Sequence, residues 1–92
     1  MVVTTAGTRE QLTADAAFTD LAAPLKSICI TAETDNTSIV VVGGSTVVAA
    51  LATRRGTPLA AGQSITYYVD DLSDIYVDAL VNGEGVTFSY EA

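Results

Sequence analysis

Residues 57–80, TPLAAGQSITYYVDDLSDIYVDAL, decide the fold of this 92-residue chain. Within 63–70 and again within 75–80, apolar side chains occupy every second position. Pro58 and Gly62 bracket a turn before the first run, and aspartates fill the turn between the two runs. Alternation of period two between turn signals is typical of half-buried antiparallel strands. The stretch therefore predicts two strands that pair with each other.

The composition predicts one small globular domain. Hydrophobic residues make up 49% of the chain and charged residues 16%, which is too apolar for a disordered segment. A chain of this length buries a thin core and is often helped by association with copies of itself or with a larger partner. A surface with so few charges also indicates that protein covers part of it.

The charge distribution limits the classes of partner. The formal net charge is −7, and the positive side chains are Arg9, Lys26, Arg54 and Arg55. Every charged residue after Arg55 is acidic. Nucleic-acid binding needs cations that displace counterions from phosphates, so we expect no nucleic-acid contact in this acidic part. Docking onto a basic protein surface is compatible with it.

The sequence contains no recognisable catalytic or phosphate-binding motif. The chain has no histidine, which removes the commonest general base and the commonest zinc ligand. The segment GGST at 43–46 lacks the lysine of a phosphate-binding loop. Cys29 is the single cysteine, which excludes an internal disulfide, and its place between Ile28 and Ile30 predicts a buried thiol. We expect neither an enzyme nor a bound cofactor.

No secretion signal and no membrane-spanning segment is predicted. The N-terminus lacks the basic and apolar regions of a secretory signal. No apolar run approaches the ~20 residues that cross a bilayer. We therefore expect no membrane contact.

Further strands are predicted along the chain, in segments rich in β-branched residues and bounded by turn-forming residues. Besides the opening pair, they cover 26–34, 38–42, 45–51 and 85–91. The run 38–42 is apolar on both sides and predicts a central strand. Residues 8–12 are predicted either as a first short strand or as part of an arm on a neighbouring subunit.

Turn signals separate these strands. Thr-Asp-Asn-Thr at 34–37 and Gly-Gly at 43–44 predict turns, ATRRG at 52–56 predicts a basic loop, and Asn-Gly at 82–83 favours a hairpin turn. One helix candidate covers 13–23, with a threonine at its start and a proline after its end. The alternative for that segment is a loop that pins apolar side chains onto the sheet.

Six or seven short strands with regularly spaced turns predict an all-β fold. We expect a small antiparallel β-sandwich or barrel, jelly-roll-like, with an extended N-terminal arm and at most one short helix. Residues 1–12 are predicted as this arm or as an edge strand, and 13–92 as a single β domain.

Four nearby aspartates are candidate metal ligands. Carboxylate oxygens this close in sequence suit calcium, although their spacing is not that of an EF-hand loop. Asp70, Asp71 and Asp74 equally suit hydrogen bonds to the backbone amides of a turn, and we favour this interpretation because it needs no ion. Strand alternation predicts that Asp78 points away from the core into solvent.

Candidate interface residues come from three places. Arg54 and Arg55 suit contact with an acidic partner, a phosphate or an acidic face of another copy. Alternation predicts Tyr67 in the core and Tyr68 and Tyr76 together on an outer face, where they suit a protein interface or a stacking platform for a sugar. We expect the first five residues to be dispensable for folding but needed for partner binding. The N-terminal candidates are Val2, Val3 and Arg9.

Three stretches carry a resemblance to a known group of proteins. They are SICITAETDNTSIVVVGGSTV at 27–47, TPLAAGQSITYYVDDLSDIYVDALVNGEGVTFSYEA at 57–92 and TAGTREQL at 5–12. An Asp-Asn turn leads into a valine-rich strand and Gly-Ser-Thr-Val, and a strand of the D-L-S-x-[IV]-Y-V-D type follows. In these segments the chain resembles small structural proteins of tailed bacteriophages and their prophages.

The resemblance implies a component of the virion. The first expectation is a capsid decoration (cement) protein, a dimer or trimer that binds the major capsid protein on the outer surface of the shell and stabilises it. The alternatives are a fibre or spike base module and, from the tyrosines, a carbohydrate-binding module. The resemblance implies no catalytic residues and no cofactor-binding residues in this chain. Residues 13–24 and 48–56 depart from the group's pattern, which makes them candidate contacts with a particular partner.

Overall fold

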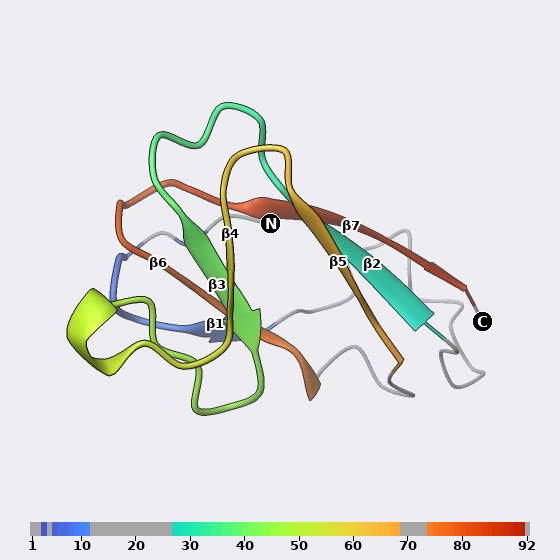
Figure 1. Cartoon of the computed structure of the whole chain (residues 1–92), viewed down its shortest axis with the longest axis horizontal. Coiled ribbons are helices and arrows are strands. Elements are labelled where there is room, and N and C mark those ends of the chain that lie inside the picture. The colour runs from blue at the N-terminus through green and yellow to red at the C-terminus, as the bar shows by residue number, and fades with distance from the viewer. Residues whose placement is uncertain (1–2, 4, 12–26, 69–73, 92) are drawn as a thin grey trace.

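In the part of the chain that the structure describes, seven short strands form two antiparallel sheets (Figure 1). The structure, a computed structural model, describes residues 3, 5–11, 27–68 and 74–91. The four-stranded sheet has the order β1-β6-β3-β4 and the three-stranded sheet the order β5-β2-β7. The predicted all-β antiparallel fold is confirmed, and of the two predicted architectures, a sandwich or a barrel, the two sheets form the sandwich. The strands are β1 (Glu10–Gln11), β2 (Ser27–Ala32), β3 (Val40–Gly43), β4 (Thr57–Leu59), β5 (Ser64–Tyr67), β6 (Tyr76–Ala79) and β7 (Val86–Glu91).

β2 is the central strand of the three-stranded sheet and pairs with β5 on one side and β7 on the other. Its side chains alternate as predicted, with Ile28, Ile30 and Ala32 fully buried. Cys29 lies on the opposite face and is partly exposed. The predicted burial of the Cys29 thiol is therefore wrong, because its position in the strand places it on the outer face of the sheet.

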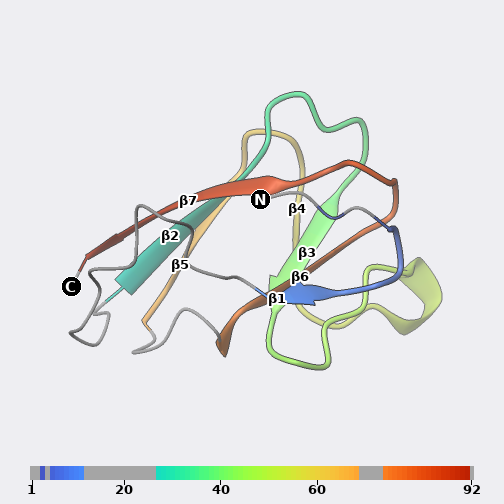
Figure 2. The same ribbon diagram turned by 180° about the vertical axis from the view of Figure 1, so that it is seen from behind.

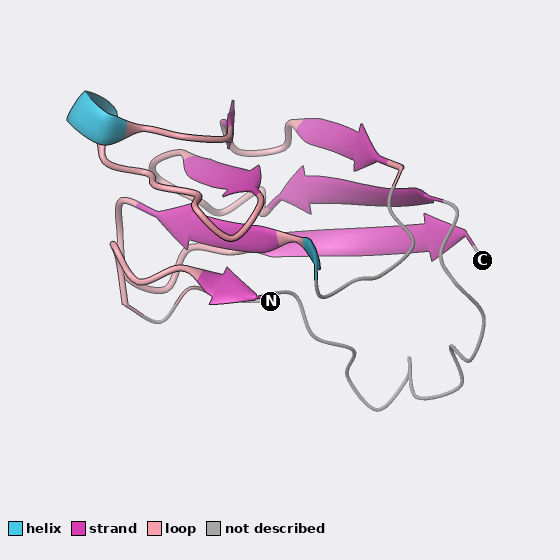
Figure 3. Cartoon of the chain, turned by 90° about the horizontal axis from the view of Figure 1, so that it is seen from below, coloured by secondary structure: helices cyan, strands magenta, loops and turns pink. Residues whose placement is uncertain are grey.

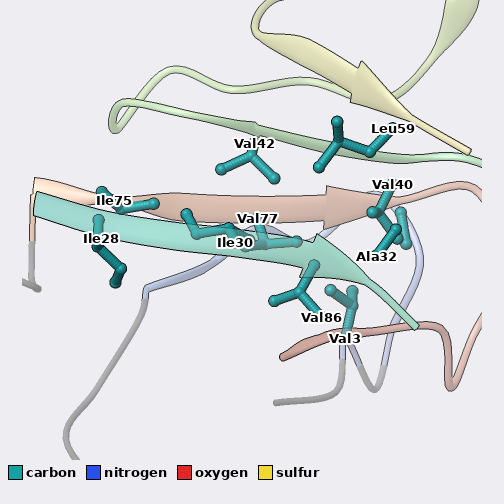
Figure 4. Packing of buried hydrophobic residues seen from close by; sticks show 11 residues of the cluster. Val3, Ile28, Ile30, Ala32, Val40, Val42, Leu59, Ile75, Val77 and Val86 are labelled. Atoms are coloured by element: carbon teal, nitrogen blue, oxygen red, sulfur yellow. The ribbon is translucent and has the colours of Figure 1, made fainter. Parts of the chain in front are cut away.

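The main core lies between the two sheets, and Figure 4 shows its aliphatic side chains. Both sheets contribute alternate residues, as expected for sheets packed face to face. Burial of one such side chain stabilises a fold by about 1.5–3 kcal/mol. The buried members are Val3, Ile28, Ile30, Ala32, Val40, Val42, Leu59, Ile75, Val77, Ala79 and Val86.

β3 is covered on both faces, as predicted for a central strand. Val40 and Val42 point into the main core, whereas Val41 packs on the opposite face against Val47 and Ala49. All three valines of the strand are fully buried. β3 also lies between β6 and β4 within its sheet. The continuous apolar sequence of β3 is thus explained, because the segment that contains Val47 and Ala49 covers the outer side of the strand.

β5 and β6 do not pair with each other, so the pairing predicted from residues 57–80 is wrong. β5 pairs with β2, and β6 pairs with β1 and β3 in the other sheet. Alternation identifies the buried face of each strand but does not select its neighbour. Both strands face the same core, from opposite sheets.

The turn at 82–83 joins the two sheets and is not the hairpin that its sequence favours, because β6 and β7 belong to different sheets. Gly83 has a φ of 87°, a conformation that glycine adopts without a steric cost. Its N–H donates to the Val3 carbonyl oxygen at 2.8 Å, and the Val3 N–H donates to the Glu84 carbonyl oxygen at 2.8 Å. This turn therefore ties the N-terminal segment to the fold.

The N-terminal segment contributes to the core and to the sheet. Val3 is completely buried in the main core. β1 is an edge strand that pairs with β6, as seen from behind in Figure 2. These contacts argue against the expectation that the first five residues are dispensable for folding. The helix predicted at 13–23 lies outside the described residues.

Candidate functional site

The segment between β3 and β4, residues 44–56, is the candidate functional site and is called the basic loop below. It folds back over the outer face of the four-stranded sheet. Val47 and Ala49 are buried there against Val41 of β3, and Tyr76 of β6 packs against the same cluster. The loop thus has a small core of its own, which fixes its base on the sheet.

The strand predicted at 45–51 is absent, since residues 44–56 form a loop with one isolated bridge, between Val48 and Arg55. The bridge consists of two backbone hydrogen bonds of 3.0 Å. The tip is a single 3-10 turn, η2 (Leu51–Thr53), which Figure 1 shows at one end of the molecule, away from the three-stranded sheet. The Arg54 Nε donates to the Ala49 carbonyl oxygen at 3.0 Å, which holds the tip closed.

Asp78 of β6 lies beneath the basic loop and is only 1% exposed. Its Oδ2 accepts the Ala49 N–H at 2.9 Å. Its Oδ1 accepts the Gly7 N–H at 3.1 Å and the Ala79 N–H at 2.9 Å. The side chain points to the outer face, as alternation predicts, but the predicted exposure to solvent is wrong. The loop and the N-terminal segment, both distant in sequence, cover it and supply the donors that a buried carboxylate requires.

Gly56 closes the base of the loop. Its φ is 115°, and a Cβ at this position would come within 2.7 Å of the Val42 carbonyl oxygen and 2.8 Å of the Val47 side chain. Both the backbone conformation and the space therefore require glycine. This close approach brings the two ends of the loop together where β3 and β4 pair.

Three arginines belong to the basic loop or contact it. Arg54 and Arg55 belong to the loop, and Arg9, from the N-terminal segment, donates from Nη1 to the Ser45 carbonyl oxygen at 2.6 Å. Arg55 is exposed and Arg54 is half-buried. Leu51 at the tip is 78% exposed. The loop therefore carries guanidinium groups, which bind carboxylates through paired donors, and one large exposed apolar side chain.

The sequence predicts Arg9, Arg54 and Arg55 as interface residues but does not predict that they adjoin one loop. Tyr68 and Tyr76 do not share an outer face, which contradicts their expected arrangement. Tyr68 follows β5 of the three-stranded sheet and is 85% exposed, whereas Tyr76 is half-buried under the basic loop on the four-stranded sheet. A two-tyrosine platform for a sugar is therefore not formed.

Tyr67 connects the two sheets. It packs against the main core, as predicted, and its hydroxyl donates to the Val42 carbonyl oxygen of β3 at 3.1 Å. The same hydroxyl lies 3.2 Å from the Thr57 Oγ1 of β4. Because β5 belongs to the other sheet, the hydrogen bonds of this hydroxyl link the two sheets beside the apolar core.

The remaining candidate residues do not form a described site. Val2, Asp70 and Asp71 lie outside the described residues, and Asp74 is exposed. Among the residues that are described, no group of three or more His, Cys, Asp or Glu side chains is arranged to hold a metal ion. Val3 is buried in the main core, so its side chain is not available to a partner in this conformation.

Glu84 is a buried carboxylate that the sequence pattern did not predict, since it stands out there only as one of the acidic residues after Arg55. The side chain is 6% exposed. Its carboxylate accepts the Thr37 N–H at 2.9 Å and the Ser38 N–H at 2.7 Å. The glycines on either side of Glu84 are a signal that could have indicated a carboxylate bonded to backbone amides in a turn.

Comparisons with known proteins found no counterpart. No protein-family model matches the chain, and neither the curated proteins nor the solved structures contain a match. Within the described residues, no helix has the length and apolar character required to span a bilayer.

Proposed function

We propose that the protein is a structural component of a bacteriophage virion, a capsid decoration protein that binds the major capsid protein on the outer surface of the shell. Two independent features support the proposal. One is the resemblance of three of its sequence segments to those of small phage structural proteins. The other is the basic loop, an ordered segment that exposes Leu51 and Arg55 at one end of the molecule (Figure 1).

The observation that carries the proposal is the fixed geometry of the basic loop. The Val48–Arg55 bridge, the bond from Ala49 to Asp78 and the bond from Arg54 to the Ala49 carbonyl oxygen order the loop before any partner binds. A preorganised loop loses little conformational entropy on docking. The exposed Leu51 supplies an apolar contact surface at the tip of the loop, and arginine is among the side chains enriched at protein interfaces.

Charge also determines how the protein would approach its partner. The chain has a net charge of −7, yet three of its four basic side chains adjoin this one loop. An acidic patch on the shell would repel most of the molecule and attract the loop. Such complementarity orients the encounter and raises the association rate. We therefore propose that the docking site on the capsid protein is acidic.

Binding of this kind stabilises a shell by mass action. A protein that binds the assembled shell and not the free subunits lowers the free energy of the assembled state. The gain is about 2.7 kcal/mol per site when the free protein is present at one hundred times its dissociation constant. A module that docks through a preformed loop delivers this gain without a large change of its own shape.

The test is cosedimentation with purified empty shells of the phage that encodes the chain. We expect the double variant Arg54→Gln/Arg55→Gln to bind about tenfold more weakly or worse, and Leu51→Asp to have a similar effect. The matched control is Thr87→Glu/Ser89→Glu on the exposed outer face of β7, which changes the net charge by the same two units. This control should bind as the wild type does.

Two outcomes would contradict the proposal. One is equal binding by the loop variants and the wild type. The other is binding that does not weaken as salt is raised from about 0.05 to 0.5 M, because contacts between exposed charges are screened over this range. Electron microscopy of the particle provides the copy number. A few copies at the tail would instead fit the fibre or spike base module that the resemblance also implies.

A further inference from the structure

β5 has one edge that pairs with β2 and one edge that faces outward. It is the first strand in the order β5-β2-β7. The Ala32 N–H donates to the Gln63 carbonyl oxygen at 2.9 Å, and the next paired positions are Ile30 with Ile65 and Ile28 with Tyr67. In an antiparallel ladder the residues between hydrogen-bonded pairs direct their backbone groups the other way. The N–H and C=O groups of Ser64, Thr66 and Tyr68 therefore point away from the sheet.

This outward edge is accessible. Ser64, Thr66 and Tyr68 are all exposed, and Tyr68 is the most exposed large hydrophobic side chain among the described residues, at 85%. Figure 3 shows β5 at the margin of the molecule, with no described strand beyond it. An unpaired row of backbone donors and acceptors at such a margin is a template for another strand.

The edge carries none of the features that normally prevent strand addition. Natural edge strands are protected by lysine, proline, bulges or a very short length. In the other sheet, the edge strand β4 contains Pro58, and the edge strand β1 has only two residues. The segment 64–68, SITYY, has no charge and no proline and is rich in residues that favour strands.

We propose that β5 pairs in antiparallel fashion with β5 of a second copy of the chain, about a two-fold axis at Thr66. Thr66 then lies opposite Thr66 of the second copy, and Ser64 lies opposite Tyr68 of the second copy. All three outward positions of each strand find partners. The two three-stranded sheets become one six-stranded sheet, and the contact is isologous, as in most dimers.

The neutral, self-complementary edge favours a second copy of the chain as the partner strand. Two molecules with a net charge of −7 repel each other at most approaches. The stretch 63–69 contains no charged residue, so this edge lets two acidic copies meet without like charges in the contact. The edge is also self-complementary, because the small Ser64 faces the large Tyr68 across the axis. A contact of one strand pair is small, so we expect a dissociation constant of about micromolar size.

The experiment measures self-association by sedimentation velocity over concentrations from about 1 µM to 1 mM. The wild type should convert from monomer to dimer. Thr66→Pro removes the N–H at the centre of the contact and should weaken the dimer at least about tenfold. That N–H points away from β2, so the fold should persist, which circular dichroism checks. Thr66→Ala keeps the N–H and should dimerise like the wild type.

A charge exchange keeps the proposal testable if the proline variant misfolds. Thr66→Lys alone and Thr66→Glu alone place like charges opposite each other, and each should dimerise about fivefold more weakly. An equal mixture of the two should form a heterodimer at least as tight as the wild-type dimer. A wild type that stays monomeric up to 1 mM would overturn the proposal, as would a mixture no tighter than its separate components. None of these outcomes depends on the proposed capsid docking, because no shell is present.

Discussion

The carboxylate of Asp78 accepts a 2.9 Å hydrogen bond from the backbone N–H of Ala49, 29 residues earlier in the chain. This bond ties the basic loop to β6. The same carboxylate accepts the Gly7 N–H, so the N-terminal segment that carries Arg9 is held at the same point. One buried side chain thus connects both segments that bring arginines to the candidate docking surface.

Replacement of Asp78 should loosen the loop and destabilise the protein. Asp78→Ala leaves the Ala49 and Ala79 amides without this acceptor, and the Gly7 amide keeps only its bond to the Ala79 carbonyl oxygen at 3.2 Å. Buried donors without partners cost free energy, so we expect the free energy of unfolding to fall by about 2–4 kcal/mol. Urea denaturation measures this change. Hydrogen exchange at the Ala49 amide should accelerate with it.

The control for that change is Asp74→Ala, an aspartate from the same acidic stretch that is exposed. It should alter the free energy of unfolding by no more than about 0.5 kcal/mol. Equal effects of the two substitutions would mean that the hydrogen bonds of Asp78 contribute little.

Gly56 and Gly44 make a matched pair at the two ends of the basic loop. Gly56→Ala places a Cβ within 2.8 Å of two valine side chains at a φ of 115°, and we expect a loss of about 3 kcal/mol. Gly44 has no atom within 4 Å of such a Cβ, so Gly44→Ala should be tolerated within about 0.5 kcal/mol. Thermal unfolding of both variants checks this. Shell binding by Gly56→Ala should weaken if the variant still folds, because the loop is no longer preorganised.

Tyr67→Phe removes the hydroxyl that joins the two sheets. The ring still packs against the core, so we expect only the loss of the hydroxyl's bonds to the Val42 carbonyl oxygen and the Thr57 Oγ1, about 1 kcal/mol. Tyr68→Phe is the adjacent control, and its exposed hydroxyl should contribute almost nothing to the free energy of unfolding. Denaturant titration of both variants should separate them. If they behave alike, the bridge between the sheets is not stabilising.

Deletion of residues 1–5 should destabilise the fold. The deletion removes the fully buried Val3 and its two backbone hydrogen bonds to the 82–84 turn. We expect a loss of about 2–4 kcal/mol, and about 2 kcal/mol for Val3→Ala. Thr8→Ala, at an exposed position of the same segment, is the control. A truncated protein that unfolds at the wild-type denaturant concentration would show that Val3 is dispensable.

Strand alternation predicted the local structure well where one face of a strand is buried. The six residues of β2 show this most clearly, because Ile28, Ile30 and Ala32 can reach the core only if the chain is extended. The same pattern failed to predict that β5 and β6 lie in different sheets. A period-two pattern states which face is buried, and any strand with a matching face can be its neighbour.

The candidate site was predicted less completely than the fold. Arg54 and Arg55 are conspicuous in the sequence, but nothing there places Arg9 against Ser45 of the same loop. The burial of Asp78 could not be read from alternation either. Its environment is created by Ala49 and Gly7, which are far from it along the chain.

The amino-acid sequence alone determined that this protein is an antiparallel all-β domain, a sandwich or a barrel, since side-chain period and turn chemistry act between near neighbours. Tertiary structure decided which strands pair, which carboxylates are buried and that Arg9 contacts the loop of Arg54 and Arg55. Those outcomes depend on segments that approach each other only when the core closes, and no local pattern encodes that approach.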